Sequence, residues 1–217
     1  RGPAVFRLSE HMARLIKSCE SYEIPSPYSA KEFIDATIEL IKENKIYACY
    51  IRPLVFYGYG HMGLNPKGAK VDAIIACWPW GTYLGEDGLE NGINAKISKW
   101  RRIHASTLPM QAKCSGNYAN SILGKLDAVN NGFDEAIMLN VEGRVADGSG
   151  ENIFLVKNNE LITPSVDEGV LKGITRDSIM TVAKDFGIKV VERPVEKKEL
   201  FESDELFFTG TAAEVTP

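Results

Sequence analysis

The sequence predicts an α+β fold built from two lobes. Helix-like and strand-like segments alternate irregularly, the first half opens with two amphipathic helices, and short strands dominate the second half. With 217 residues, 44% of them hydrophobic and 25% charged, the chain has ordinary globular composition and needs no disulfide or metal to hold a core. We expect an N-terminal lobe over residues 1–104, a connecting segment over 105–112 and a C-terminal lobe over 113–217.

In the first lobe, apolar residues at three- and four-residue steps predict a helix from Ser9, its N-cap, to Tyr22. A second apolar face predicts a helix over 29–43. Residues rich in β-branched and aromatic side chains predict three strands, with a Gly-rich and mobile loop over 58–68 between the first two. These strands are expected at 47–57, 71–78 and 93–100.

The second lobe is expected to carry two helices, 117–131 before Gly132 and 175–186 between Gly173 and Gly187. Its turns are expected at 141–144 and 158–159. The strands predicted around these turns and helices are 135–140, 153–157, 161–163, 189–193 and 205–209.

Charge and hydropathy exclude several classes of protein. The net charge is −4 and no basic block stands out, so nucleic acid is not an expected partner. No apolar run approaches the roughly 20 residues of a membrane helix, so no membrane partner is expected. The four cysteines form no Cys-x-x-Cys pair, so we expect no metal site, reduced thiols and a cytoplasmic location. The start at Arg1 without Met and the stop at Pro217 suggest an excised fragment.

Lys113 is the first candidate for chemistry. Its neighbours Ala112, Ser115 and Gly116 are small, which allows a planar ligand to approach closely. A lysine amine held there could form a Schiff base with a carbonyl compound. The alternative is a solvated surface lysine, which local sequence alone favours.

Two carboxylates, Asp147 and Glu151, flank a Gly-Ser-Gly turn that opens a strand. Such a turn can aim a carboxylate into a cleft, where it could pair with a protonated ring nitrogen. The alternative is a surface turn, since Gly, Ser and Asp are common turn formers.

Two segments are candidates for binding an anion. The run 171–176 opens the helix predicted at 175, and the amides of Ile174 and Thr175 would meet a phosphate at the positive end of the helix dipole. The run 210–213 ends the last strand with small residues. Read singly, each is more often a plain helix cap or turn.

Taken together and in order, these segments resemble one family. The motifs Gly150-Glu151-Asn152-Ile153-Phe154, Leu161-Ile162-Thr163 and Leu171-Lys172-Gly173-Ile174-Thr175-Arg176 look like the signature of the class IV (fold-type IV) pyridoxal-phosphate aminotransferases. The branched-chain amino acid aminotransferases match best, over essentially the whole chain. The resemblance implies a small α/β lobe, a larger mixed-sheet lobe and pyridoxal 5'-phosphate between them.

The resemblance also implies roles for residues. Lys113 matches the lysine that binds the cofactor covalently and moves the proton of the substrate Cα. Tyr118 matches a tyrosine near the ring hydroxyl, and Asp147 takes the place of the carboxylate at the ring nitrogen. The positions that match phosphate-binding residues are Arg14, Leu171, Ile174, Thr175 and Thr211.

The expected substrate site joins two parts of the chain. Tyr50 and Arg52 alternate on one face of a strand, and the arginine would recognise the distal carboxylate of glutamate. Trp80 and Tyr83 match aromatic walls, for which core packing is the alternative. The backbone amides of Ala212 and Ala213 would bind the α-carboxylate.

The implied reaction moves the amino group of leucine, isoleucine or valine to 2-oxoglutarate, giving branched 2-oxo acids and glutamate, as part of branched-chain amino acid biosynthesis. The implied assembly is a homodimer or higher homo-oligomer, in which loop 58–68 reaches a neighbouring site. The rivals are another class IV activity (D-amino acid or (R)-amine transfer, or aminodeoxychorismate lyase) and a non-catalytic homologue.

Two departures from the family pattern stand out. The signature normally carries Glu where this chain has Asp147, which is shorter by one methylene. Our hypothesis is that Asp147 keeps the role with reduced efficiency, since a misplacement near 1 Å can cost on the order of 100-fold in rate. Family members also continue upstream of Arg1 and beyond Pro217, so the substrate half of the site is expected to be incomplete.

Overall fold

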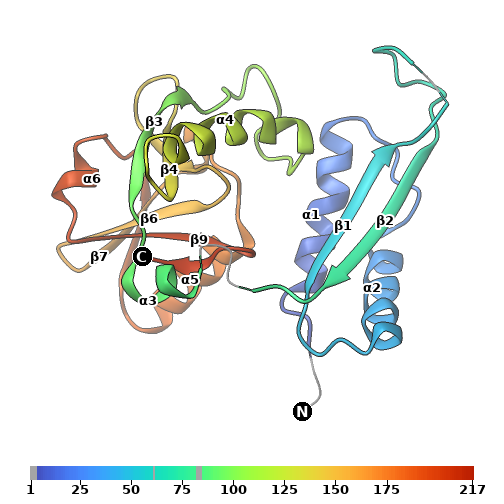
Figure 1. Cartoon of the computed structure of the whole chain (residues 1–217), viewed down its shortest axis with the longest axis horizontal. Helices are drawn as coiled ribbons and strands as arrows, with labels where there is room; N and C mark the ends of the chain where they lie inside the picture. Colours follow the sequence, from blue (N-terminus) through green and yellow to red (C-terminus); the bar gives the residue numbers. More distant parts are fainter. Residues whose placement is uncertain (1–3, 61, 82–84) are drawn as a thin grey trace. The chain divides into compact units, whose positions relative to one another are not determined.

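The structure is a computed structural model that describes residues 4–60, 62–81 and 85–217. By contacts the chain divides into two compact units, Arg1–Trp80 (unit 1) and Gly81–Pro217 (unit 2). No helix in the described ranges is long and apolar enough to cross a bilayer. Both units mix helices and strands, so the predicted α+β class is confirmed (Figure 1).

Unit 1 is a two-stranded antiparallel sheet with two helices packed on it (Figure 1). Its core lies between the helices and one sheet face, where Met12, Phe33 and Val55 are buried. The other sheet face carries the alternate side chains of each strand. The elements are α1 (Leu8–Ser21), α2 (Ala30–Asn44), β1 (Tyr50–Tyr57) and β2 (Val71–Trp78).

Unit 2 holds a three-stranded and a five-stranded sheet. The strand orders are β3-β4-β5 and β10-β9-β6-β7-β8. The strands are β3 (Ala95–Arg101), β4 (Glu135–Leu139), β5 (Val145–Gly148), β6 (Asn152–Lys157), β7 (Glu160–Pro164), β8 (Lys189–Arg193), β9 (Glu205–Gly210) and β10 (Glu214–Thr216).

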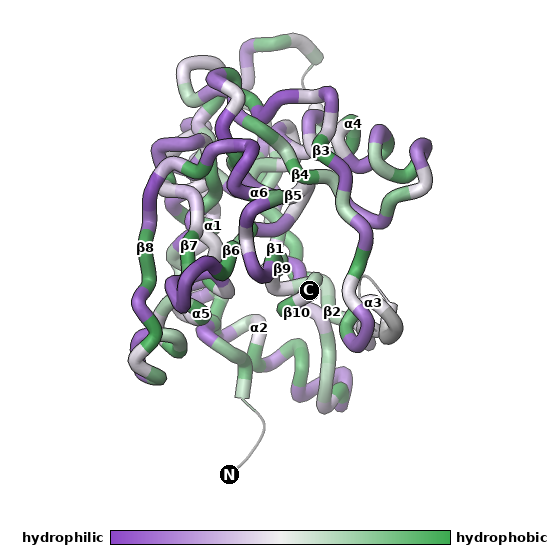
Figure 2. The backbone as a smooth tube through the Cα atoms, turned by 90° about the vertical axis from the view of Figure 1, so that its left-hand side faces the viewer, coloured by the Kyte–Doolittle hydropathy of each residue, from purple (hydrophilic) through white to green (hydrophobic). Residues whose placement is uncertain are grey.

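Two cores lie in unit 2. One joins β4 and β5 to the five-stranded sheet through residues such as Ile137, Val145, Ile153 and Phe208. The other lies between this sheet and helix α5 (Ile174–Asp185), where the Phe154 and Phe207 rings stack at 5.2 Å between centroids. Hydrophilic residues flank the two valines of the edge strand β8 (Figure 2), and such charged edges discourage pairing with another chain.

The helices of unit 2 fix the loops around its sheets. Gly124 of α4 lies so close to β4 that a Cβ there would be 2.9 Å from the Met138 sulfur. Helix α5 connects the parallel strands β7 and β8. The helices are α3 (Glu86–Asn91), α4 (Tyr118–Val129), α5 (Ile174–Asp185) and α6 (Glu199–Glu202), with 3-10 turns at Ser115–Asn117 and Val166–Glu168.

Several sequence-based expectations differ from the structure. The N-cap of α1 is Arg7, in the left-handed region with φ 49°, and not Ser9. The compact units divide after Trp80 and not within 105–112, because β3 pairs in parallel with β4 and so belongs to unit 2. Asp147 lies in strand β5, where only a turn was expected. The short elements α3, α6, β5 and β10 were not predicted.

Candidate functional site

Lys113 lies in an irregular segment between β3 and α4, and its side chain is exposed. Its Nζ donates a hydrogen bond to Tyr118 Oη at 2.5 Å and lies 5.2 Å from the centre of that ring. Tyr118 is the first residue of α4, so the helix fixes the phenol beside the amine. An amine and a phenol at this distance can exchange a proton and hold each other in place.

Asp147 is buried in β5, with 6% of its surface exposed. Burial raises the pKa of its carboxyl to about 6, although the Arg102 guanidinium beside it acts in the opposite direction. Arg102 donates from Nε to Oδ1 at 2.8 Å and also from Nη2 to the same oxygen. A buried carboxylate with such a counter-ion could in turn pair with a protonated ring nitrogen.

Arg102 connects this carboxylate to α4, and so to the lysine. Its Nη1 donates to Ser121 Oγ at 2.9 Å, one turn after Tyr118 in the same helix. Its Nη2 also donates to the Gly148 carbonyl. Lys113–Tyr118 and Arg102–Asp147 are therefore two separate contact pairs, and helix α4 carries a partner of each, Tyr118 and Ser121.

Glu151 follows Asp147 after the Gly-Ser-Gly turn and is also buried. Its pKa is raised to about 7, first by burial and then by the charge of Glu135. Glu135 is fully buried and accepts from Lys125 Nζ at 2.8 Å. Gly148 is tightly packed here, since a Cβ would lie 3.0 Å from both Glu151 Oε2 and the Phe208 ring.

The start of α5 is the predicted anion-binding segment. Its N-cap is Gly173, which offers no side chain to cap the helix. A Cβ at Gly173 would lie 2.0 Å from Asn152 Oδ1, so this position requires glycine unless Asn152 moves. The Asn152 amide in turn donates to the Leu171 carbonyl at 2.9 Å. The N-terminal amides of α5 can therefore face an anion without a side chain in between.

A second small-residue turn lies beside Glu151. Strands β9 and β10 are joined through Thr211, Ala212 and Ala213. A Cβ at Gly210, just before this turn, would be 3.5 Å from Glu151 Cγ. This packing brings the turn next to the carboxylate that follows β5.

Thr209 supplies an unsatisfied polar atom close to the start of α5. Its Oγ1 is buried and has no hydrogen-bond partner within the described ranges. Its antiparallel register partner is Asn152, so the two side chains lie on the same face of the sheet. An unused hydroxyl here leaves hydrogen-bonding capacity near Gly173.

Unit 1 carries the other predicted site residues. Arg14 lies in α1, half-buried. Tyr50, Trp78 and Trp80 form an aromatic cluster with centroid distances of 5.1–5.7 Å. The Arg52 guanidinium lies 5.3 Å from the Tyr50 ring centre and 5.4 Å from the Trp78 ring centre. Tyr83 lies outside the described residues.

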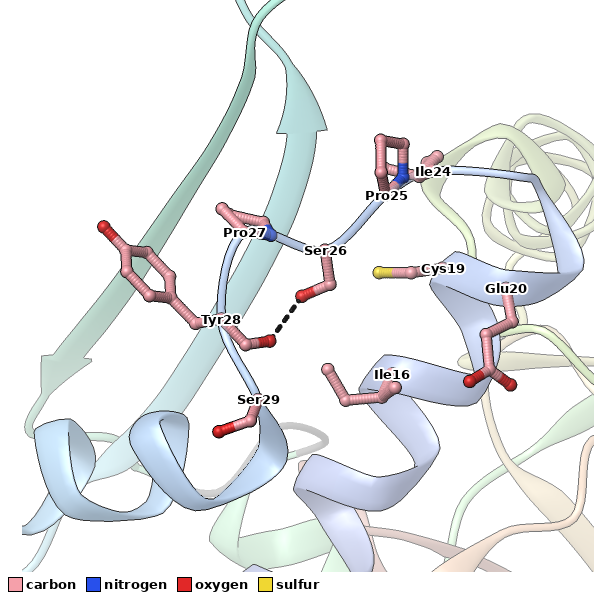
Figure 3. Close-up of a pocket in the computed structure, with 9 residues that line it drawn as sticks. All are labelled: Ile16, Cys19, Glu20, Ile24, Pro25, Ser26, Pro27, Tyr28 and Ser29. Atoms are coloured by element: carbon pink, nitrogen blue, oxygen red, sulfur yellow. Dashed lines mark hydrogen bonds between the residues drawn. The ribbon is translucent and has the colours of Figure 1, made fainter.

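A shallow hollow of about 390 Å³ lies in unit 1 between the second half of α1 and loop 24–29 (Figure 3). Its lining includes Cys19, Glu20 and Ser26, whose Oγ donates to the Tyr28 carbonyl at 2.8 Å. None of the predicted site residues lines it. Within the described part of the chain, no group of three or more His, Cys, Asp or Glu side chains is placed to hold a metal ion.

Arg102, Glu135 and Lys125 were not among the predicted site residues. Each is partnered with a residue at least ten positions away, so no short motif marks them. Only Glu135 carries a signal in the sequence. It places a charge at the start of the apolar run of β4, and a buried charge requires a partner.

Comparison with known proteins places these contacts in context. The family model described as amino-transferase class IV matches residues 1–217. Branched-chain-amino-acid aminotransferases of Pseudomonas aeruginosa and Escherichia coli K12 are 46% and 45% identical over the whole chain, which spans 70% and 71% of those proteins.

Two solved structures are similar along essentially the whole chain. The Escherichia coli branched-chain amino acid aminotransferase has a TM-score of 0.97 at 45% identity, and the chain covers 71% of it. The branched-chain amino acid aminotransferase of Thermobaculum terrenum, solved in its PLP-form, has a TM-score of 0.91 at 36% identity. That comparison covers 98% of this chain and 69% of the other.

Proposed function

The chain belongs to the class IV aminotransferases, and we propose that it moves the amino group of leucine, isoleucine or valine to 2-oxoglutarate. The observation that carries the proposal is that helix α4 holds a partner of each of two pairs, the amine pair Lys113–Tyr118 and, through Ser121, the buried pair Arg102–Asp147. The relatives described above are named for the branched-chain reaction, which supports this choice of substrate.

The family cofactor is pyridoxal 5'-phosphate, and the residues of unit 2 fit it. The cofactor needs an amine for its aldehyde, an acid for its ring nitrogen and donors for its phosphate. Lys113 and Asp147 offer the first two. Gly173 provides no side-chain cap, and the Thr209 hydroxyl has no partner among the described residues, so donor capacity remains at the start of α5. Ile174, Thr175 and Thr211 would hold the phosphate, together with the Leu171 segment and Arg14.

The cofactor, when bound, supplies an electron sink for the electron pair left as the substrate Cα loses its proton. Lys113 Nζ would take that proton and return it, as base and then acid. Tyr118 Oη orients the amine through the 2.5 Å hydrogen bond. Burial raises the pKa of Asp147 to about 6, and Arg102 opposes that rise and favours the carboxylate, which would hold a proton on the ring nitrogen.

For the substrate, we propose that Tyr50, Trp80 and Tyr83 form apolar walls and that Arg52 binds the distal carboxylate of 2-oxoglutarate or glutamate. The cation–π contacts of Arg52 with Tyr50 and Trp78 support this, since they hold the guanidinium beside an apolar surface. The amides of Ala212 and Ala213 would bind the α-carboxylate, next to Glu151.

We also propose a cytoplasmic homodimer or larger homo-oligomer. The four cysteines are free thiols in the structure, which supports a reducing compartment. Sedimentation of the purified enzyme tests the assembly, and a monomer at micromolar concentration would contradict it.

To test the function, pyridoxal 5'-phosphate is added to the intact enzyme. The visible absorbance band of lysine-bound cofactor is then recorded before and after borohydride is added. We expect a band that borohydride removes, and transamination from L-leucine to 2-oxoglutarate. Activity with D-alanine but not L-leucine would indicate a different class IV reaction. Absence of the band would reject the enzyme proposal in favour of a non-catalytic homologue.

A further inference from the structure

The segment that carries Lys113 has almost no regular structure of its own. Residues 102–114 lie between β3 and the 3-10 turn at 115, and their internal backbone bonds are short-range. Examples are Ala112 N to Pro109 O at 3.1 Å and Cys114 N to Ala112 O at 3.0 Å. Such bonds shape the segment locally. At its two ends the segment is also tied to unit 2, since the Arg102 amide donates to the Leu139 carbonyl at 2.8 Å and Asn117 Nδ2 donates to the Ala112 carbonyl at 3.2 Å.

Gln111, the only glutamine of the chain, makes a long-range tie two residues before Lys113. Its Nε2 donates to the Val170 carbonyl at 2.8 Å, and its Oε1 accepts from the Lys172 amide at 3.3 Å. One primary amide therefore satisfies a carbonyl and an N–H of the same short stretch of backbone.

The stretch that Gln111 binds leads directly into the phosphate segment. Residues 170–173 carry no regular structure and end at Gly173, the N-cap of α5. Between the two bonds of Gln111, the Leu171 carbonyl accepts from Asn152 at 2.9 Å. Val170 is almost fully buried, so its carbonyl needs a protein partner in place of water.

We propose that Gln111 is a positioning residue that sets the separation between the Lys113 amine and the N-terminal amides of α5. The inference rests on the proposed function, in which one cofactor molecule contacts both places. When the Gln111 hydrogen bonds hold these two places at a fixed separation, a cofactor bound at one place is already positioned to bind at the other. The two contacts of the cofactor then strengthen each other. Without the Gln111 hydrogen bonds, the Lys113 amine and the amides of α5 can each still bind a ligand. Their separation, however, no longer matches the length of the cofactor.

The experiment compares the binding of the complete cofactor with the binding of two smaller ligands, each of which contacts only one of the two places. Pyridoxal 5'-phosphate contacts both places, whereas pyridoxal engages the lysine alone and inorganic phosphate engages α5 alone. The variants are Gln111→Met, which keeps length and loses both hydrogen bonds, and Gln111→Asn, which keeps the amide but is one methylene too short. Asn131→Ala is the matched control, because its amide donates to the Asp127 carbonyl at 2.7 Å near the end of α4.

We expect Gln111→Met and Gln111→Asn to bind pyridoxal 5'-phosphate roughly tenfold more weakly, the size expected from two partly exposed hydrogen bonds. Their affinities for pyridoxal and for inorganic phosphate should stay within about twofold of wild type, as should all three affinities of Asn131→Ala. A loss of affinity for pyridoxal 5'-phosphate alone identifies Gln111 as a positioning residue. A local collapse of the structure would also weaken the binding of pyridoxal and of inorganic phosphate.

Two results would overturn the inference. One is unchanged binding of pyridoxal 5'-phosphate in both variants, and the other is equal weakening of all three probes. Wild-type enzyme that fails to bind pyridoxal 5'-phosphate would instead reject the proposed function, so the two failures are distinguishable.

Discussion

The two units hold their predicted site residues by different physical means. In unit 1, Tyr50, Arg52 and Trp80 rest on ring and cation–π contacts at the surface of a two-stranded sheet, with Trp80 41% exposed. In unit 2, Asp147 and Arg102 are buried and fixed by charge-assisted hydrogen bonds. Ring and cation–π contacts at an exposed surface are weaker than charge-assisted hydrogen bonds between buried groups, so they suit a site that accepts different side chains. Buried charges tolerate little displacement, so they suit the chemistry that all substrates share.

The largest effect should follow removal of the amine in unit 2. Lys113→Ala leaves the substrate Cα without a proton acceptor, and we expect transamination to fall by about 10³-fold or more. Lys184→Ala, near the end of α5, is the control and should keep at least half of the activity. Steady-state kinetics with leucine measures both, and a mild effect at Lys113 would contradict its assignment.

Breaking the buried ion pair should cost more stability than breaking a surface pair. Arg102→Met leaves Asp147 buried without its partner, for an expected loss of about 3–5 kcal/mol in the free energy of unfolding. In unit 1, Lys31→Ala removes an exposed i,i+4 pair with Asp35 and should change the free energy of unfolding far less, because solvent screens an exposed pair. Urea unfolding compares the two variants, and equal losses would show that the Arg102 pair is not distinctive.

The units should also respond oppositely to pH. Burial raises the pKa of Asp147 to about 6 and of Glu151 to about 7, so the folded state binds these protons more tightly than the unfolded state. Their contribution to stability is present at low pH and is lost as pH rises from about 4 to 7. In unit 1, hydrogen bonds from Ser29 lower the pKa of Glu32, whose contribution is lost as pH falls through that lowered pKa.

Urea unfolding between pH 3 and 8 separates these contributions. Glu151→Gln should flatten the decline above pH 5, and Glu32→Gln should change only the acid side. A Glu151→Gln profile parallel to wild type would contradict the raised pKa.

In unit 1, Arg52→Met should affect substrate choice with little effect on stability. The variant loses cation–π contacts worth about 0.5–1 kcal/mol at an exposed site, together with the proposed carboxylate contact. We expect KM for 2-oxoglutarate to rise about tenfold while KM for leucine changes less than twofold. Equal changes for both substrates would argue against carboxylate recognition by Arg52.

The smallest expected effect is that of Asp147→Glu. A longer side chain reaches further towards the ring nitrogen, but Arg102 already holds the shorter carboxylate at Oδ1. We therefore expect transamination to increase by less than about tenfold. No gain, or a loss, would mean that Asp147 already serves well or that another group carries the role.

Local patterns in the sequence predicted most long elements. The strand Val71–Trp78 and helix Ile174–Asp185 fall within a residue or two of expectation, because apolar periodicity and flanking glycines mark them. Strand Val145–Gly148 was not predicted, because it has only four residues and ends in a turn motif. Its pairing with β4, which the sequence does not encode locally, makes it a strand.

Motifs in the sequence indicated the candidate site residues, whose roles stay predictions, but they did not indicate the residues that hold these side chains in place. Lys113 and Asp147 stand in recognisable runs, whereas Arg102 lies 45 positions from Asp147 and Gln111 lies 59 from Val170. Such contacts depend on how loops are folded over the sheets, and no short-range spacing rule describes them. The sequence also gives no sign that the Thr209 hydroxyl is buried without a partner among the described residues, because that depends on how its neighbours pack.

The irregular segment 102–114 also has a consequence for how the protein resists proteases. A stretch with few long-range backbone bonds opens locally at lower free energy than the sheets around it, and cleavage requires such opening. Any ligand that bonds to Lys113 lowers the population of the open form. Limited proteolysis within 105–112 would therefore report cofactor occupancy directly, through the rate at which the chain is cut.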